Sequence, residues 1–273
     1  MYLESGVDLL ARSNTAHDHK ADLFDNSLSF LLSEFGKKFI LFHCDVQLTA
    51  TLFAQQILSL MSMNLIAAKN RRAVIGICDF SATFCANRFR SLLKSSVTTI
   101  GYRSSEKLVE DMLKDQLFYT QCHNAANFTC SLLQIFQQLR ESAPDLSLLL
   151  IHGYFDYFLQ HSALELDKEF FESLNVIKEV MSYWRDSKII FIDNITKIEV
   201  EQSNFVKTKK INHSLQPTVE WSYKSLLRSL SAVFEDSQSL YLVQGDEDNG
   251  RNRFKIFYDR GSGDSTMDFI ATL

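Results

Sequence analysis

Glycine and proline are scarce in this 273-residue chain, which contains 9 glycines and 2 prolines. Average usage of about 7% would give roughly 19 glycines. So few of these residues exclude a collagen-like or low-complexity protein, while 46% hydrophobic residues, with 22 Phe among them, are enough to bury a large core. The shortage also concerns function, because phosphate-binding loops use glycine to let the backbone approach the ligand.

Long apolar runs, a strong net charge and paired cysteines are also missing. No run of 18 apolar residues occurs, and the first 25 residues include charged side chains, so we expect a soluble, non-secreted protein with no membrane partner. A net charge of −5 means that any contact with nucleic acid needs a local basic patch. The five cysteines never form a CxxC pair, which predicts buried, reduced thiols and no bound metal.

Apolar segments alternate with helical patterns from residue 28 onward, after a polar leader at 1–27. We expect buried strands at 39–42, 73–78, 148–151 and 188–192, and helices at 50–63, 84–94, 125–140 and 168–185. Strands without polar alternation that are separated by helices are typical of a parallel sheet covered on both faces. The pattern predicts an α/β fold in which residues 28–273 form a single domain.

The pattern changes after residue 200. Residues 201–219 carry several lysines without an apolar period, which is typical of a long, mobile, basic loop. Residues 240–243 and 254–258 alternate like two antiparallel strands, and we place the turn of this β-hairpin at 246–250.

The segment after the first predicted strand has the length of a phosphate-binding loop, G-x-x-x-x-G-K-[ST]. In that frame, Cys44 and Thr49 occupy the two glycine positions and Ala50 occupies the lysine position, so only Thr51 fits. The glycines free backbone amides and the lysine neutralises phosphate. We therefore predict that this loop does not bind a nucleotide.

Five stretches, at 4–12, 39–51, 79–84, 148–158 and 254–259, follow one another in the order of a known family. Through them the chain resembles the RecA-like recombinase core of eukaryotes, and within it the small X-ray repair cross-complementing paralogues. The resemblance covers nearly the whole chain. It implies a RecA-like P-loop ATPase core, with a mostly parallel central sheet flanked by helices and a C-terminal β-hairpin.

The resemblance also implies that the catalytic residues of the family have been lost. The phosphate-loop lysine corresponds to Ala50, and the glutamate that orients the attacking water corresponds to Ser81, two residues after Asp79. An acidic residue supporting magnesium corresponds to His152, and the γ-phosphate-sensing glutamine to Ile195. Because ATP hydrolysis needs these groups together, we expect a pseudo-ATPase without a cofactor of its own, with any ATP bound by a partner subunit.

By the same resemblance, the chain would pair with another recombinase paralogue and support the recombinase on single-stranded DNA during homologous recombination in the nucleus. The family's second DNA-facing loop corresponds to the basic segment, with Lys207, Lys209, Lys210 and His213 as candidate contacts. A solvated run of charges explains the same lysines equally well. Asp259 corresponds to a position over the neighbouring subunit's nucleotide.

Two other hypotheses remain open on the sequence alone. Cys44 and His152, with Asp79 or Asp193, have the residue types of a nucleophilic enzyme. A scaffold that makes no contact with DNA is the third alternative. The aromatic residues at 154, 155, 157 and 158 fit either a packed core or a subunit interface.

Overall fold

The computed structural model describes residues 39–69, 72–99, 105–142, 145–160, 164–184, 187–194, 240–248, 251–259 and 264–271. The predicted leader at 1–27 and the basic loop at 201–219 lie outside these residues. The first half of the described chain contains β1 Phe39–Cys44, α3 Gln47–Ala68, β2 Ala73–Asp79, α4 Ala86–Thr99, α5 Ser105–Asp115, β3 Leu117–Gln121 and α6 Ala125–Ser142. The second half contains β4 Asp145–His152, α7 Tyr154–Gln160, α8 Leu164–Tyr183, β5 Lys188–Asn194, β6 Leu240–Asp248, β7 Arg251–Asp259 and β8 Asp264–Ala271.

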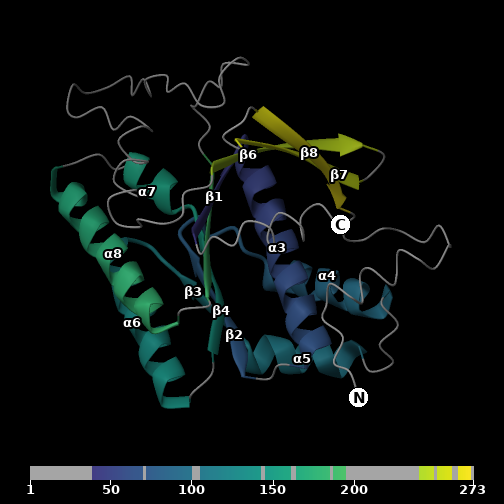
Figure 1. Cartoon of the computed structure of the whole chain (residues 1–273), viewed down its shortest axis with the longest axis horizontal. Helices are drawn as coiled ribbons and strands as arrows, with labels where there is room; N and C mark the ends of the chain where they lie inside the picture. Colours follow the sequence, from purple (N-terminus) through teal and green to yellow (C-terminus); the bar gives the residue numbers. More distant parts are fainter. Residues whose placement is uncertain are drawn as a thin grey trace.

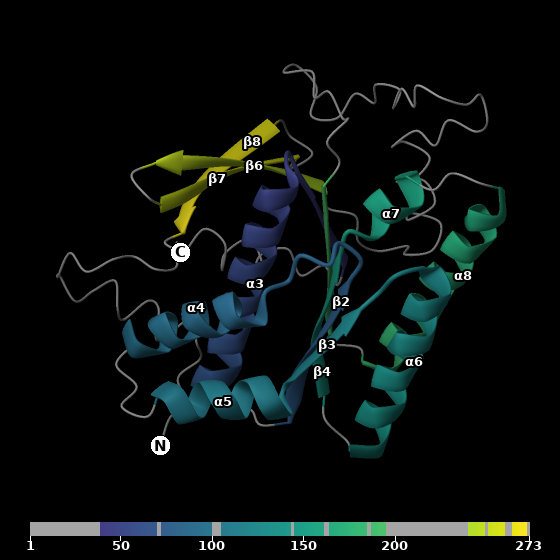
Figure 2. The same cartoon turned by 180° about the vertical axis from the view of Figure 1, so that it is seen from behind.

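The strands form one sheet in the order β3-β2-β4-β5-β1-β6-β7-β8. All neighbouring pairs from β3 to β6 are parallel, and β7 is antiparallel to both β6 and β8. Helices α3, α4 and α5 cover one face, and α6, α7 and α8 cover the other (Figures 1 and 2). The expected α/β class with a mostly parallel sheet is confirmed, and the arrangement is compatible with a Rossmann-like or RecA-like fold.

Each face of the sheet has its own hydrophobic core, because neighbouring residues of a strand point to opposite faces. In β1, Ile40 and Phe42 pack on the α3 side, whereas Phe39 and Leu41 pack on the α6–α8 side. Both sets are buried, which explains why β1 has no polar alternation. Tyr154, Phe155 and Phe158 of α7 are also buried, so these three aromatic residues belong to the core.

Helix α3 is buried on nearly all sides. By length and composition it could cross a membrane, but 83% of its most apolar window is buried inside the protein, as is typical of a core helix. Phe53 packs between Phe42 of β1 and Phe254 of β7, with ring centroids 4.9 and 5.7 Å away. The helix ends at Ala68 and is capped by Lys69, which adopts the left-handed conformation with φ 52°.

Several elements differ from the sequence-based expectation. Helices α5 and α7 and strands β3 and β8 were not predicted, because each is short or carries polar residues on its exposed side. Strands β6 and β7 pair antiparallel as expected, but the turn predicted at 246–250 is too long, because β6 continues to Asp248, which pairs with Arg251 of β7. Among the cysteines, Cys44, Cys78 and Cys122 are buried as expected, but Cys85 and Cys130 are exposed.

Candidate functional site

The candidate site lies at the carboxyl edge of the sheet, where open parallel sheets bind ligands. Strands β1, β2, β4 and β5 end there at Cys44, Asp79, His152 and Asn194. Asp79 and His152 are the last residues of β2 and β4. Because side chains of a strand alternate between the two faces of the sheet, both of these point to the α3 side. The edge therefore faces the first turn of α3.

The junction between β1 and α3 is too short to form a phosphate loop. Only Asp45 and Val46 separate the end of β1 from Gln47, the first residue of the helix. The Asp45 carboxylate accepts a hydrogen bond from the Val46 amide at 2.9 Å. A negative side chain therefore occupies the place where a phosphate would approach the helix N-terminus.

The three later positions of the phosphate-loop frame all lie inside α3. Thr49 packs against Gly245 of β6, where an added Cβ would lie 2.6 Å from the Thr49 Oγ1. Ala50 has no exposed surface and belongs to the hydrophobic core, so a lysine there would bury its charge. Thr51 alone reaches the carboxyl edge, where its hydroxyl contacts Thr83 at 2.8 Å.

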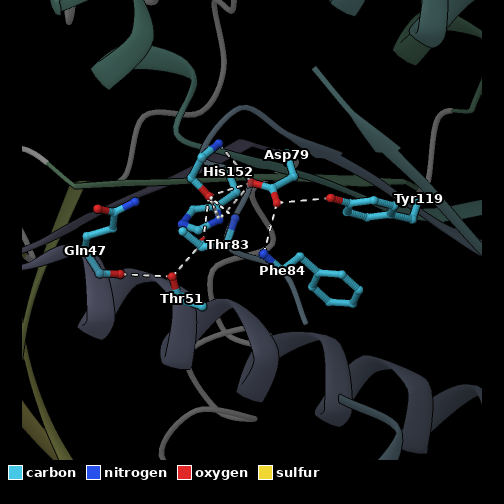
Figure 3. A network of polar contacts seen from close by, with 8 residues as sticks. Gln47, Thr51, Asp79, Thr83, Phe84, Tyr119 and His152 are labelled. Atoms are coloured by element: carbon cyan, nitrogen blue, oxygen red, sulfur yellow. Dashed lines mark hydrogen bonds and ion pairs between the residues drawn. The ribbon is translucent and has the colours of Figure 1, made fainter. Parts of the chain in front are cut away.

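A polar network centred on Asp79 fills this edge (Figure 3). One carboxylate oxygen, Oδ1, accepts hydrogen bonds from the Ser81 amide at 3.0 Å and the Ser81 hydroxyl at 2.6 Å, and lies 3.3 Å from His152 Nδ1. The other, Oδ2, accepts from the Phe84 amide at 3.1 Å and the Tyr119 hydroxyl at 3.3 Å. Both oxygens are therefore committed to donors of the chain itself.

Three hydroxyl groups connect the Asp79 carboxylate to helix α3. Ser81 Oγ lies 2.7 Å from Thr83 Oγ1, which in turn contacts Thr51 Oγ1. Ser81 donates its proton to Asp79, and Thr51 donates its own to the Gln47 carbonyl at 3.0 Å. The single Thr83 proton is therefore the one that can bridge Ser81 and Thr51, which ties the β2–α4 loop to the first turn of α3.

The network controls the ionisation of Asp79. Burial by itself raises the pKa of this carboxyl, but the hydrogen bonds from His152 and Ser81, the charge of His152 and the Phe84 amide outweigh it and lower the pKa to about 2. Asp79 is therefore ionised at neutral pH although its side chain has no exposed surface.

The loop between β2 and α4 holds the network in place at some conformational cost. Ala82 adopts a left-handed conformation with φ 54°, which costs ~1 kcal/mol for a residue other than glycine. Gly153, with φ 74°, follows β4 and packs against this loop, because an added Cβ would lie 3.1 Å from the Ser81 amide. Both backbone features bring Ser81 close to His152.

The nucleophilic set proposed from the sequence is only partly assembled. Asp79 and His152 are in contact, but Cys44 is 1% exposed, and burial followed by the nearby Asp45 and Asp193 raises the pKa of its thiol well above the usual range. A reactive cysteine needs the opposite shift. Ser81 does not replace it, because Ser81 and Asp79 both contact Nδ1 of His152, whereas a triad uses both ring nitrogens.

Asp193 has a separate role on the opposite face of the sheet. Its Oδ1 accepts hydrogen bonds from the Phe155 and Asp156 amides at 2.8 and 3.1 Å, so the side chain holds the start of α7. Burial raises the pKa of this carboxyl well above its usual range, since the two amides offset only part of the desolvation.

Sequence reasoning missed Thr83 and Tyr119, although it identified Asp79, Ser81, Thr51 and His152. Thr83 lies within the stretch 79–84, and a second hydroxyl residue two positions after Ser81 could have indicated that it belongs to the site. Tyr119 belongs to β3, which was not predicted, and its aromatic ring stacks on Phe84 with centroids 5.0 Å apart. Nothing local in the sequence shows that β3 lies beside β2, the strand that ends at Asp79.

Other candidate residues cannot be placed in this site. Ile195, Lys207, Lys209, Lys210 and His213 lie outside the described residues. Asp259 ends β7, two strands away from β1. In the described part of the chain, no group of three or more His, Cys, Asp or Glu side chains could hold a metal ion.

Comparison with known proteins gives no assignment. No protein-family model matches the chain, and no curated protein is similar enough in sequence to count as a relative.

Proposed function

We propose that this chain is a non-catalytic, RecA-like subunit of a recombinase-paralogue complex. In this proposal it pairs with another paralogue that binds ATP, and helps the recombinase assemble on single-stranded DNA during homologous-recombination repair in the nucleus. The proposal rests on the sequence resemblance to the family of recombinase paralogues and on an α/β sheet compatible with that fold.

The β1–α3 junction is the observation that most supports a non-catalytic role. Two residues connect the strand to the helix, Asp45 places a carboxylate at the helix N-terminus, and Ala50 is buried where the family has its lysine. A triphosphate at this position would meet a negative charge and would find no lysine or arginine in the first turns of α3. The five donors around the Asp79 carboxylate also leave neither of its oxygens free for magnesium.

Partner identification tests the proposal most directly. The tagged full-length chain is purified from its native cells under mild conditions, and co-purifying proteins are identified by mass spectrometry. Recovery of a recombinase paralogue in stoichiometric amount is the expected result. If the chain is recovered as a stable homo-oligomer with no such partner, the proposal is wrong.

Nucleotide binding separates the subunit from an enzyme. The purified chain is expected to show no ATP binding by equilibrium dialysis and no turnover, whereas its complex binds ATP through the partner. Hydrolysis by the isolated chain that disappears in Thr51→Ala would contradict a non-catalytic role.

DNA contact by the basic segment is tested by charge removal. Changing Lys207, Lys209 and Lys210 to Ala in the complex should weaken single-strand binding and flatten its dependence on salt, because fewer counterions are released. A matched control removes the exposed lysines Lys107, Lys114 and Lys178, with the same change in net charge. Equal affinity in both variants favours a scaffold without DNA contact.

A further inference from the structure

We draw no further inference here: the strongest candidate, the partly exposed aromatic surface patch of Phe136, Tyr183 and Trp184 where α6 packs against the end of α8, carries none, because nothing in the structure shows what covers it.

Discussion

Asp79 and Asp193 are both buried aspartates at the carboxyl edge, yet their surroundings shift their pKa values in opposite directions. Five donors surround the Asp79 carboxylate, and its pKa falls to about 2. Asp193 accepts hydrogen bonds from two amides, and burial raises its pKa well above the usual range. The charge of Asp79 therefore stabilises the fold, whereas ionising Asp193 opposes it.

Replacing each of these residues by Asn should have opposite consequences. Asp79→Asn is expected to lower the free energy of unfolding at pH 7 by about 2 kcal/mol, since a pKa shift of one unit corresponds to ~1.4 kcal/mol. Asp193→Asn, the matched control, keeps an oxygen for the two amides and should leave stability unchanged or raise it. Urea denaturation measures both. A similar loss in the two variants would show that the charge of Asp79 has no special role.

His43 and Asp79 each make stability fall as the pH decreases, but over different pH ranges. Burial lowers the pKa of His43 to about 3, so the unfolded chain takes up its proton first and stability falls as pH decreases from 6.5 toward 3. The contribution of Asp79 is present above its ordinary pKa of 3.8 and disappears as pH falls toward 2.

Replacing His43 by Leu should make stability depend less on pH in the upper of these two pH ranges. We expect the loss between pH 6.5 and pH 4 to be reduced by several kcal/mol, whereas the decline below pH 4 persists. Denaturant titrations across the pH range test this expectation. An unchanged slope above pH 4 would mean that other groups control it.

At the scale of single elements, the short, continuous apolar runs were the parts most readily predicted from the sequence. The cores of β1, β2, β4 and β5 are buried on both faces, so they have no polar alternation and are easily recognised. Strand β3 was not predictable, because an edge strand exposes part of its surface and LFYTQ is only five residues long. The Asp79–Tyr119 contact depends on β3, so that half of the site could not be predicted either.

The contact between β6 and α3 gives a prediction at this scale. Gly245→Ala would place a methyl group against the Thr49 side chain and should cost about 1–3 kcal/mol of stability. Thr49→Ala in the same chain removes the clashing atoms, so the double variant should regain most of that loss. Thermal denaturation of the single and double variants measures this coupling.

Gly153→Ala is the control for that experiment. Its Cβ would meet the backbone nitrogen of Ser81, and its φ of 74° disfavours any side chain, so no side-chain truncation should restore stability. The contrary outcome is that Ser81→Gly restores the stability of Gly153→Ala as fully as Thr49→Ala restores that of Gly245→Ala. In that case the contact with the Ser81 backbone does not cause the loss of stability in Gly153→Ala.

At the scale of the whole molecule, the two ends of the described chain complete one core. Strands β6 to β8 lie beside the first turns of α3 in both views, and Phe254 of β7 packs on Phe53 (Figures 1 and 2). Burying an aromatic side chain contributes about 1.5–3 kcal/mol. Segments that are far apart in the sequence therefore pack together in one core.

A chain that ends at residue 239 should not fold to the native state. It lacks β6 to β8, so the side of α3 that contacts Phe254 would be left in water. We expect such a chain to bind a hydrophobic dye, to lose near-ultraviolet circular dichroism and to aggregate. A monomeric fragment with cooperative urea unfolding would show that the C-terminal strands are an independent addition.

The position of α3 also has a consequence during protein synthesis. The helix leaves the ribosome early, yet Phe254 is made roughly 180 residues later, which corresponds to ~10–40 s at ordinary translation rates. During that interval a 22-residue apolar helix has no complete cover. Nascent chains of this protein should therefore be clients of chaperones that hold exposed apolar segments, and their yield should fall when such chaperones are depleted.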